Sequence, residues 1–450
     1  MMFEEITHEQ GGLRITLYRK GEPLYQKSRH PSQYGIYSEV EDPHGLYRFN
    51  LNHELIRMQE KGNRWPDPRE WLKRTDGNDW IYYASGGYSG AFEEVGKGVL
   101  PKPISFRVPS PYSEIYKATG EYYLPNFQYS SNTISSEDPF QRPAVAHLLA
   151  NWYPRLKASL EDAGPLPEPF RSFAEKVLET TPESLQQRSQ HLFQTAGFRP
   201  SVLPPDTRHV DYQLIPLDIA EGCRYQCGFC EVKSRQPFCT HSLQKISQTI
   251  EDLKEFYGED LINYNALFLG DHDALNADEE TLIQSTEKAV AELGLIYSYM
   301  KGICLFLFGS VDSFLRCSDA LLEALEKTGC RVYINLGLES AHQATLDWLK
   351  KPVQASRVIE CFEKMLEVNE HYQQIEVTGN FLLGDDLPPE HYDAFLQLAR
   401  ESVPHPMNKG TFYFSPLIAS GKPSRHLLYY FNQLKRMSRL PVYLYNIQRL

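Results

Sequence analysis

Three cysteines within eight residues are the side chains of this 450-residue sequence best suited to chemistry. Cys223, Cys227 and Cys230 stand in EGCRYQCGFCEVKS at CxxxCxxC spacing, which lacks the two CxxC pairs of a zinc ribbon. A cubane [4Fe–4S] cluster usually takes four thiolates, so a loop that offers three leaves one iron open to a ligand that is not protein. The spacing therefore predicts a cluster with an open, reactive iron.

A structural zinc ion is the main alternative for these cysteines. Zinc would accept the same three thiolates, with Cys239 or His241 as the fourth ligand. In a reducing compartment, grouped cysteines bind metal or carry out redox chemistry rather than form a disulfide frame.

The cysteines follow the first of six apolar, strand-like runs that alternate with amphipathic helices. We expect strands within residues 212–220, 264–271, 303–310, 331–340, 375–386 and 410–418, and helices at 243–257, from 278 onward, and at 319–327, 341–350, 356–368 and 390–401. Strands joined by helical crossovers form a parallel sheet that is buried on both faces. Six such units predict an α/β fold, a partial (β/α)6 TIM-like barrel, with its active site at the carboxyl ends of the strands.

The first 200 residues differ from the rest of the chain in composition and in hydrophobic pattern. Aromatic residues, Gly and Pro are frequent up to about residue 138, which favours short strands and loops, and the sequence becomes helical from Pro139 to Phe193. We therefore predict an N-terminal α+β accessory domain at residues 1–205, the barrel at 206–420 and a C-terminal extension at 421–450.

With Phe229 as the aromatic residue before the last cysteine, CRYQCGFC resembles the CxxxCxφC loop of the radical S-adenosylmethionine (radical SAM) superfamily, in which φ is aromatic. The resemblance covers roughly residues 211–420 and places Phe229 at the cofactor. It implies that the three cysteines hold a [4Fe–4S] cluster whose open iron binds S-adenosylmethionine. Reductive cleavage of that molecule would give a 5′-deoxyadenosyl radical, which abstracts hydrogen from a substrate. An oxygen-sensitive enzyme that needs a reductant such as flavodoxin or ferredoxin is implied as well.

The resemblance also implies roles for residues beyond the cysteines. Gly270, Asp271 and His272 occupy the turn after the second strand, where relatives commonly have a GGE-like turn that holds the amino end of the cofactor. Glu339, at the end of the fourth strand, resembles the acidic residue that contacts the ribose hydroxyls. Arg357 stands where several relatives place an arginine for the cofactor carboxylate, an anion that a guanidinium binds through two hydrogen bonds.

Two further residues are candidates for facing the substrate. Asp312 follows the third predicted strand, and Tyr413 lies in the sixth. The substrate itself is not readable from the sequence.

The net charge and the sequence composition indicate which kinds of substrate and partner the protein has. Acidic residues outnumber basic ones by 58 to 46, which gives a formal charge of −12 and makes a small molecule or a peptide a better substrate than a nucleic acid. The N-terminus lacks a signal-peptide pattern, and the apolar stretch ICLFLFGSV is too short to span a membrane, so we expect a cytoplasmic protein without a membrane partner.

The remaining cysteines and the absence of one motif reduce the number of reaction types that the enzyme could catalyse. The other five cysteines are scattered, which disfavours a second cluster that donates sulfur, and the DxHxxG motif of a cobalamin domain is absent from the sequence. A single-cluster enzyme that performs a rearrangement, an oxidation, a carbon–carbon bond change or a cobalamin-free methylation remains. The other hypotheses are a non-catalytic iron–sulfur electron carrier or sensor, and a zinc-stabilised binding module.

Overall fold

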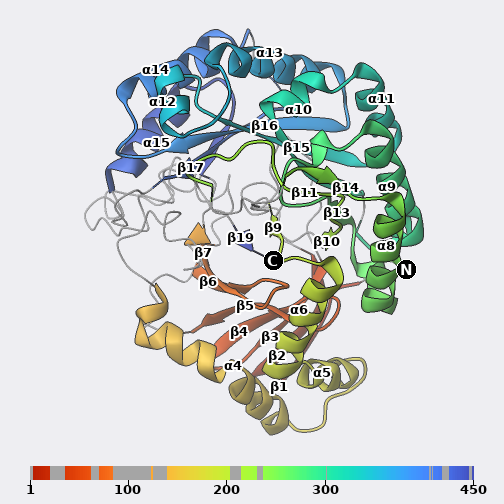
Figure 1. Ribbon diagram of the computed structural model, residues 1–450. Helices are drawn as coiled ribbons and strands as arrows, with labels where there is room; N and C mark the ends of the chain where they lie inside the picture. Colours follow the sequence, from red (N-terminus) through yellow and green to blue (C-terminus); the bar gives the residue numbers. More distant parts are fainter. Residues whose placement is uncertain are drawn as a thin grey trace.

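The computed structural model describes residues 4–20, 36–61, 70–84, 123–124, 139–202, 214–230, 237–300, 302–404, 407, 409–417, 425–444 and 448–449. Within them, one antiparallel sheet near the N-terminus and one parallel sheet in the second half organise the chain (Figure 1). The predicted domain boundaries near residues 205 and 420 lie outside the described residues.

The antiparallel sheet has eight strands in chain order, each pairing with the next. They are β1 (Ile6–Gln10), β2 (Leu13–Lys20), β3 (Ile36–Glu41), β4 (Gly45–Phe49), β5 (Leu55–Glu60), β6 (Glu70–Arg74), β7 (Trp80–Ala84) and β8 (Tyr123–Leu124). Three helices follow, α4 (Pro143–Asp162), α5 (Phe170–Glu179) and α6 (Pro182–Ala196). Leu13, Ile15 and Leu17 recur at every second residue of β2 and share one core with Val145 and Leu148 of α4, which confirms the predicted α+β character.

The parallel sheet contains the six predicted strands and one more. In order they are β10 (Leu214–Pro216), β13 (Ala266–Phe268), β14 (Cys304–Ser310), β15 (Arg331–Glu339), β16 (Ile375–Leu383), β17 (Phe412–Pro416) and β18 (Val442–Leu444). Because β18 pairs in parallel with β17, the sheet continues into the segment that we assigned to a C-terminal extension. The α/β fold with a partial TIM-like barrel is confirmed.

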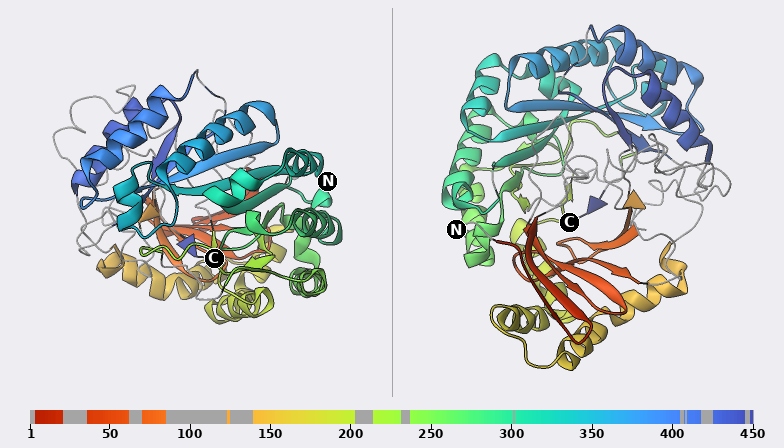
Figure 2. Two further views of the ribbon diagram at one scale, coloured as in Figure 1. Left: turned by 45° about the horizontal axis from the view of Figure 1, so that its top comes forward. Right: turned by 180° about the vertical axis from the view of Figure 1, so that it is seen from behind.

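Helices cover the convex side of this sheet. They are α8 (Leu243–Tyr257), α9 (Glu279–Glu292), α10 (Val311–Arg316), α11 (Asp319–Lys327), α12 (Gln343–Trp348), α13 (Ala355–His371), α14 (Pro389–Leu396) and α15 (Arg425–Met437). In two opposite views these helices form an outer arc, the strands lie inside it, and the antiparallel sheet lies on the open side (Figures 1 and 2). No helix in the described ranges combines the length and the apolar character that a membrane crossing requires.

Side chains alternate between the two faces of the parallel sheet. Leu305 and Leu307 of β14 join the core under the helices, whereas Phe306 and Phe308 pack with a separate group of residues on the concave face. Asn335 of β15 lines a pocket on that concave face. In β14 the strand periodicity thus places leucines toward the helices and phenylalanines toward the interior of the barrel.

Candidate active site

One pocket lies on the concave face of the barrel, at the carboxyl ends of its strands. The volume of this cavity is about 190 Å³. Its lining comes from the cysteine loop after β10, from the loop after β13 and from β14, β15 and β16. The topology therefore brings together segments that are far apart in the sequence, as expected for the ligand-binding end of a parallel α/β sheet.

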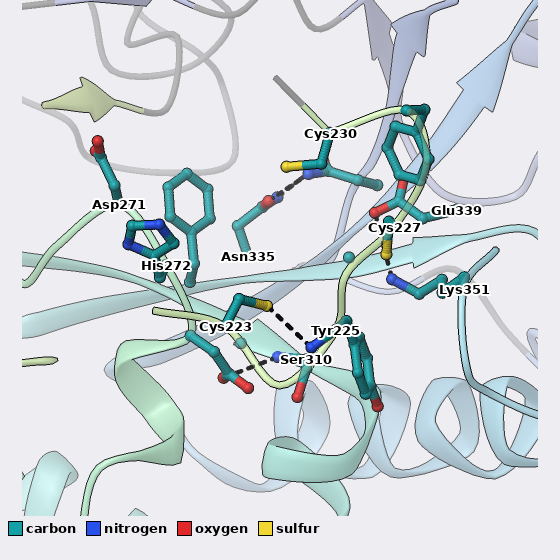
Figure 3. Close-up of a pocket in the computed structure, with 16 residues that line it drawn as sticks. Cys223, Tyr225, Cys227, Cys230, Asp271, His272, Ser310, Asn335, Glu339 and Lys351 are labelled. Carbon is teal, nitrogen blue, oxygen red and sulfur yellow. Dashed lines mark hydrogen bonds and ion pairs between the residues drawn. The ribbon is translucent and has the colours of Figure 1, made fainter. Parts of the chain in front are cut away.

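The cysteine loop runs along one side of this pocket, and Cys223, Cys227 and Cys230 all line it (Figure 3). The loop is held locally because the Tyr225 N–H donates to Cys223 Sγ at 3.3 Å, and at its outer side because the Gly228 N–H donates to the Leu349 carbonyl at 2.8 Å. The segment that contains the cysteine loop begins and ends in a short antiparallel ladder, in which β11 (Ala220–Glu221) pairs with β12 (Cys239–Thr240).

Burial affects the chemistry of these thiols. It raises the pKa of Cys223, and it raises the pKa of Cys227 to about 11. Both are therefore thiols at neutral pH, and metal binding must displace their protons.

The arrangement of the cysteines suits a cluster better than a single ion. Zinc needs its thiolates gathered around bonds of about 2.3 Å, and no three Cys, His, Asp or Glu side chains of the described residues are gathered closely enough to hold one metal ion. A cluster several atoms across instead takes each thiolate on a different iron. Neither of the proposed fourth zinc ligands is among the residues that line the pocket: Cys239 is exposed, and His241 Nε2 lies 3.4 Å from Asp218 Oδ2.

A buried lysine, which sequence analysis missed, lines the pocket beside the cysteines. Lys351 is 5% exposed, and its Nζ lies 3.6 Å from Glu339 Oε1 and 5.1 Å from the centre of the Tyr225 ring. Figure 3 shows it on the same side as Cys227 and Glu339. A cation in this position favours an anionic ligand in the pocket.

A buried aspartate, also missed, faces the pocket near Cys223. Asp273 is 4% exposed, and its Oδ1 accepts hydrogen bonds from the Ser310 N–H at 3.0 Å and from Ser313 Oγ at 2.6 Å. Its Oδ2 is buried and has no hydrogen-bond partner among the described residues. Burial raises the pKa of Asp273 even though the two serines favour the charged form. A cationic ligand group would satisfy the second oxygen and recover the ionised form.

Glu339 stands at an unusual backbone position. Its φ is +66°, and the pairing register between β15 and β16 shifts between Gly337 and Glu339. The next residue, Ser340, lies with its Oγ 2.8 Å from His391 Nδ1, whose ring Nε2 lies 2.8 Å from the Leu382 carbonyl. Burial raises the pKa of Glu339, although Lys351 opposes the effect.

The other predicted residues divide into those at the pocket and those away from it. Phe229, Asp271 and His272 line it. Gly270 lies at the base of the same turn with φ of +114°, and a Cβ there would collide with Asp218 Oδ1, so this position requires glycine.

Asp312, Arg357 and Tyr413 are not among the residues that line the pocket. Asp312 accepts a hydrogen bond from the Tyr225 hydroxyl at 2.6 Å, so it holds the cysteine loop. Arg357 pairs with Asp312 at 3.3 Å and with Glu360 at 3.2 Å. Tyr413 pairs in register with Asn380, whose side chain lines the pocket, so it belongs to the concave face.

A pair of asparagines lies deeper in the barrel. Asn380 Nδ2 donates to Asn335 Oδ1 at 2.6 Å, and Asn335 Nδ2 donates to Asn380 Oδ1 at 3.1 Å and to Thr378 Oγ1 at 2.8 Å. Because each Nδ2 carries two N–H groups, one N–H of Asn380 remains for a ligand in the pocket.

Comparisons with known proteins agree with the motif. Residues 217–399 match the family model of the Radical SAM superfamily. The ribosomal protein uS12 methylthiotransferase RimO of Synechococcus sp. (strain JA-2-3B'a(2-13)) is 25% identical over 222 residues, which make up 47% of this chain and 41% of that relative. The chain thus matches less than half the length of this curated relative.

Two solved structures also resemble the chain. SuiB from Streptococcus suis, bound to S-adenosylmethionine, is 12% identical with a TM-score of 0.35 over 67% of this chain and 62% of that one. A radical SAM methyltransferase from Sphaerobacter thermophilus is 14% identical with a TM-score of 0.35 over 66% of this chain and 92% of that one.

The fold and the family match define the class of protein. Residues 217–399 form a domain of the radical SAM superfamily. Domains of this superfamily use a [4Fe–4S] cluster and S-adenosylmethionine.

Proposed function

We propose that Cys223, Cys227 and Cys230 hold the [4Fe–4S] cluster and that the enzyme uses it to abstract hydrogen from a small molecule or a peptide. The observation that carries this proposal is that all three thiols line one pocket together with a buried carboxylate, Asp273, and a buried ammonium group, Lys351. When bound, the cluster and S-adenosylmethionine supply one-electron reduction of the sulfonium and a carbon radical that abstracts hydrogen. The roles below describe what the chain itself contributes.

The charged side chains match the amino-acid end of S-adenosylmethionine. Lys351 would bind its carboxylate, and Asp273 would accept hydrogen bonds from its ammonium group through the buried Oδ2. Glu339 would accept hydrogen bonds from the ribose hydroxyls. Asp271 and His272, which directly precede Asp273 in the sequence, also line the pocket and would close the amino end. This proposal assigns the carboxylate to Lys351 in place of Arg357, because Arg357 is already paired with two carboxylates outside the pocket.

The rest of the pocket would orient the substrate and exclude water. Phe229 and Phe308 give it apolar walls, and the asparagine pair offers a hydrogen-bond donor on the barrel interior. The antiparallel sheet lies over the open side of the arc, which suits a role as a cap over the substrate. A single-cluster rearrangement, oxidation, carbon–carbon bond change or cobalamin-free methylation fits this site. The reductive cleavage needs an electron, which flavodoxin or ferredoxin would supply in the cytoplasm.

Anaerobic cleavage of S-adenosylmethionine tests the proposal. The protein would be reconstituted with iron and sulfide, reduced with dithionite, and assayed for 5′-deoxyadenosine by mass spectrometry. We expect product from wild type and from Cys239→Ala, whose thiol lies outside the pocket, and none from Cys227→Ala. A cluster that binds no S-adenosylmethionine would indicate an electron carrier or sensor. One zinc per chain without sulfide, lost in Cys239→Ala, would indicate a zinc-stabilised binding module.

A further inference from the structure

Tyr225 lies between the first two cysteines of the loop, and its side chain reaches α10. It is 7% exposed, and its hydroxyl donates to Asp312 Oδ2 at 2.6 Å and accepts from the Asp312 N–H at 3.2 Å. Asp312 stands in the first turn of α10, where a backbone N–H has no partner within the helix. The two hydrogen bonds therefore fix both the position and the direction of the Tyr225 hydroxyl.

The backbone of the same residue contacts a cysteine. The Tyr225 N–H donates to Cys223 Sγ at 3.3 Å, as a dashed line in Figure 3 marks. A hydrogen bond to a thiolate that binds a cluster stabilises the reduced, more negatively charged form of the cluster, and so raises its reduction potential. The place of Tyr225 thus bears on the chemistry of one of the three thiols.

The turn that holds Tyr225 also holds the buried aspartate of the pocket. Ser310 and Ser313 begin α10 with a reciprocal capping box, and the Ser310 N–H and the Ser313 hydroxyl both donate to Asp273 Oδ1. Asp312 of the same turn bonds to the cysteine loop. The cysteine loop and Asp273 are therefore attached to one capped helical turn, which fixes their relative positions.

We propose that Tyr225 is a positioning residue for the iron–sulfur cluster, which keeps the N–H···S hydrogen bond to Cys223 in place by anchoring the loop to Asp312. The inference rests on the proposed function, in which the three cysteines hold the cluster. Its consequence is that a hydroxyl bonded to α10, rather than to a cysteine, affects the reduction potential of the cluster and the retention of its iron.

Removal of the hydroxyl alone tests the anchor. Tyr225→Phe keeps the buried ring and its contact with Lys351 Nζ, 5.1 Å from the ring centre, and loses the bonds to Asp312. Asp312→Ala removes the other partner, whose side chain is 33% exposed. Tyr153→Phe is the matched control, because the Tyr153 hydroxyl of α4 donates to the Leu178 carbonyl of α5 at the same distance of 2.6 Å.

Each protein would be reconstituted with iron and sulfide and studied without S-adenosylmethionine or substrate. A redox titration followed by electron paramagnetic resonance gives the midpoint potential of the cluster. Transfer of iron to the chelator bathophenanthroline gives the rate of iron loss. Urea unfolding of the metal-free proteins compares their stabilities, so that a general loss of stability is recognised.

We expect Tyr225→Phe and Asp312→Ala to release iron about fivefold faster than wild type or more, and to have a lower midpoint potential. The double variant should be affected no more than either single variant, because both changes break the same contact. Tyr153→Phe should match wild type in both properties.

A wild-type midpoint potential in Tyr225→Phe would overturn the proposal even if iron were released faster, because faster release alone would show only a looser loop. Equal changes in Tyr153→Phe, or additive effects in the double variant, would overturn it as well. Failure of wild type to assemble a [4Fe–4S] cluster would instead refute the proposed function and, with it, the basis of this inference.

Discussion

At the scale of single residues, Lys351 and Asp273 matter most because each is a buried charge next to the cysteines. A lone buried charge is costly unless a partner compensates it, and Asp273 Oδ2 has no partner among the described residues. Neither residue could be identified from the sequence. Lys350 and Lys351 are adjacent in the sequence, but Lys350 is exposed and Lys351 is buried. The turn at Lys350, where φ is +54°, produces this difference. The cysteines were identifiable because their spacing alone carries the chemistry.

Substitution of Lys351 tests which cation binds the cofactor carboxylate. A hydrogen bond to a charged group contributes about 1.5 to 3 kcal/mol, so Lys351→Ala should weaken binding of S-adenosylmethionine roughly 10- to 150-fold. Calorimetry on the reconstituted protein would measure the dissociation constant, with iron content as a check. Arg357→Gln is the matched comparison and should leave affinity within about twofold. The reverse pattern would return the carboxylate to Arg357.

Asp273→Asn makes the parallel test at the amino end of the cofactor. The amide keeps the size of the side chain but cannot compensate an ammonium group, so we expect about tenfold or greater loss of affinity for S-adenosylmethionine. S-adenosylmethionine analogues without the amino group should bind wild type and Asp273→Asn equally. An unequal affinity for that analogue would argue against a direct contact.

At the scale of elements, sequence patterns predicted helices well where caps and periodicity agree. Residues 243–257 and 319–327 form α8 and α11 as predicted, each begun by a serine that accepts a hydrogen bond from the third residue of the helix, Ser242 and Ser318. The turn after β15 could not be predicted, because its shape depends on Ser340 meeting His391, 51 residues later. Arg357 is not among the residues that line the pocket, and it pairs with Asp312 of α10, a contact that the sequence does not reveal either.

The Ser340–His391 contact predicts a pH dependence of stability. Burial lowers the pKa of His391 from its ordinary 6.5 to about 4, and only the neutral ring can accept a hydrogen bond from Ser340 while it donates to the Leu382 carbonyl. Between these two values the unfolded chain binds more protons than the folded one. The contribution of His391 to the free energy of unfolding should therefore be largest above pH 6.5 and fall toward pH 4 by up to about 1.4 kcal/mol per pH unit. Urea unfolding at several pH values measures this slope.

His391→Asn gives the matched comparison for that slope. The variant should be less stable at pH 7, because a buried hydrogen-bonded ring is lost, yet its stability should change less between pH 6.5 and 4. His53, whose pKa burial also lowers to about 4, remains in both proteins and cancels in the difference. Parallel slopes for the two proteins would show that His391 does not titrate as described.

At the scale of the whole molecule, the two sheets are joined by contacts that no local pattern reveals. Arg188 of α6 reaches Glu54, next to β5, at 2.8 Å and Asp260 of η5 (Gly258–Asn263) at 3.2 Å, and its guanidinium lies over the Phe256 ring. The short strands β9 (Ser201–Val202) and β19 (Gln448–Arg449) pair as well, so the residues that follow α6 contact a segment beyond β18. Removal of residues 1–200 would therefore also remove contact partners of the barrel, such as Arg188.

Substitution of Arg188 is a cleaner way to separate the two parts. Breaking a buried ion pair costs about 3 to 5 kcal/mol, and because the Arg188 side chain is 30% exposed we expect Arg188→Ala to lower the free energy of unfolding by roughly 2 to 4 kcal/mol. Denaturant unfolding should then resolve two transitions, one for each sheet. Arg171→Ala, which breaks an exposed pair with Glu168, should cost less than about 1 kcal/mol. If the antiparallel sheet caps the substrate, Arg188→Ala should keep cleavage of S-adenosylmethionine and lose substrate turnover, whereas equal loss of both would place the contact in the support of the barrel itself.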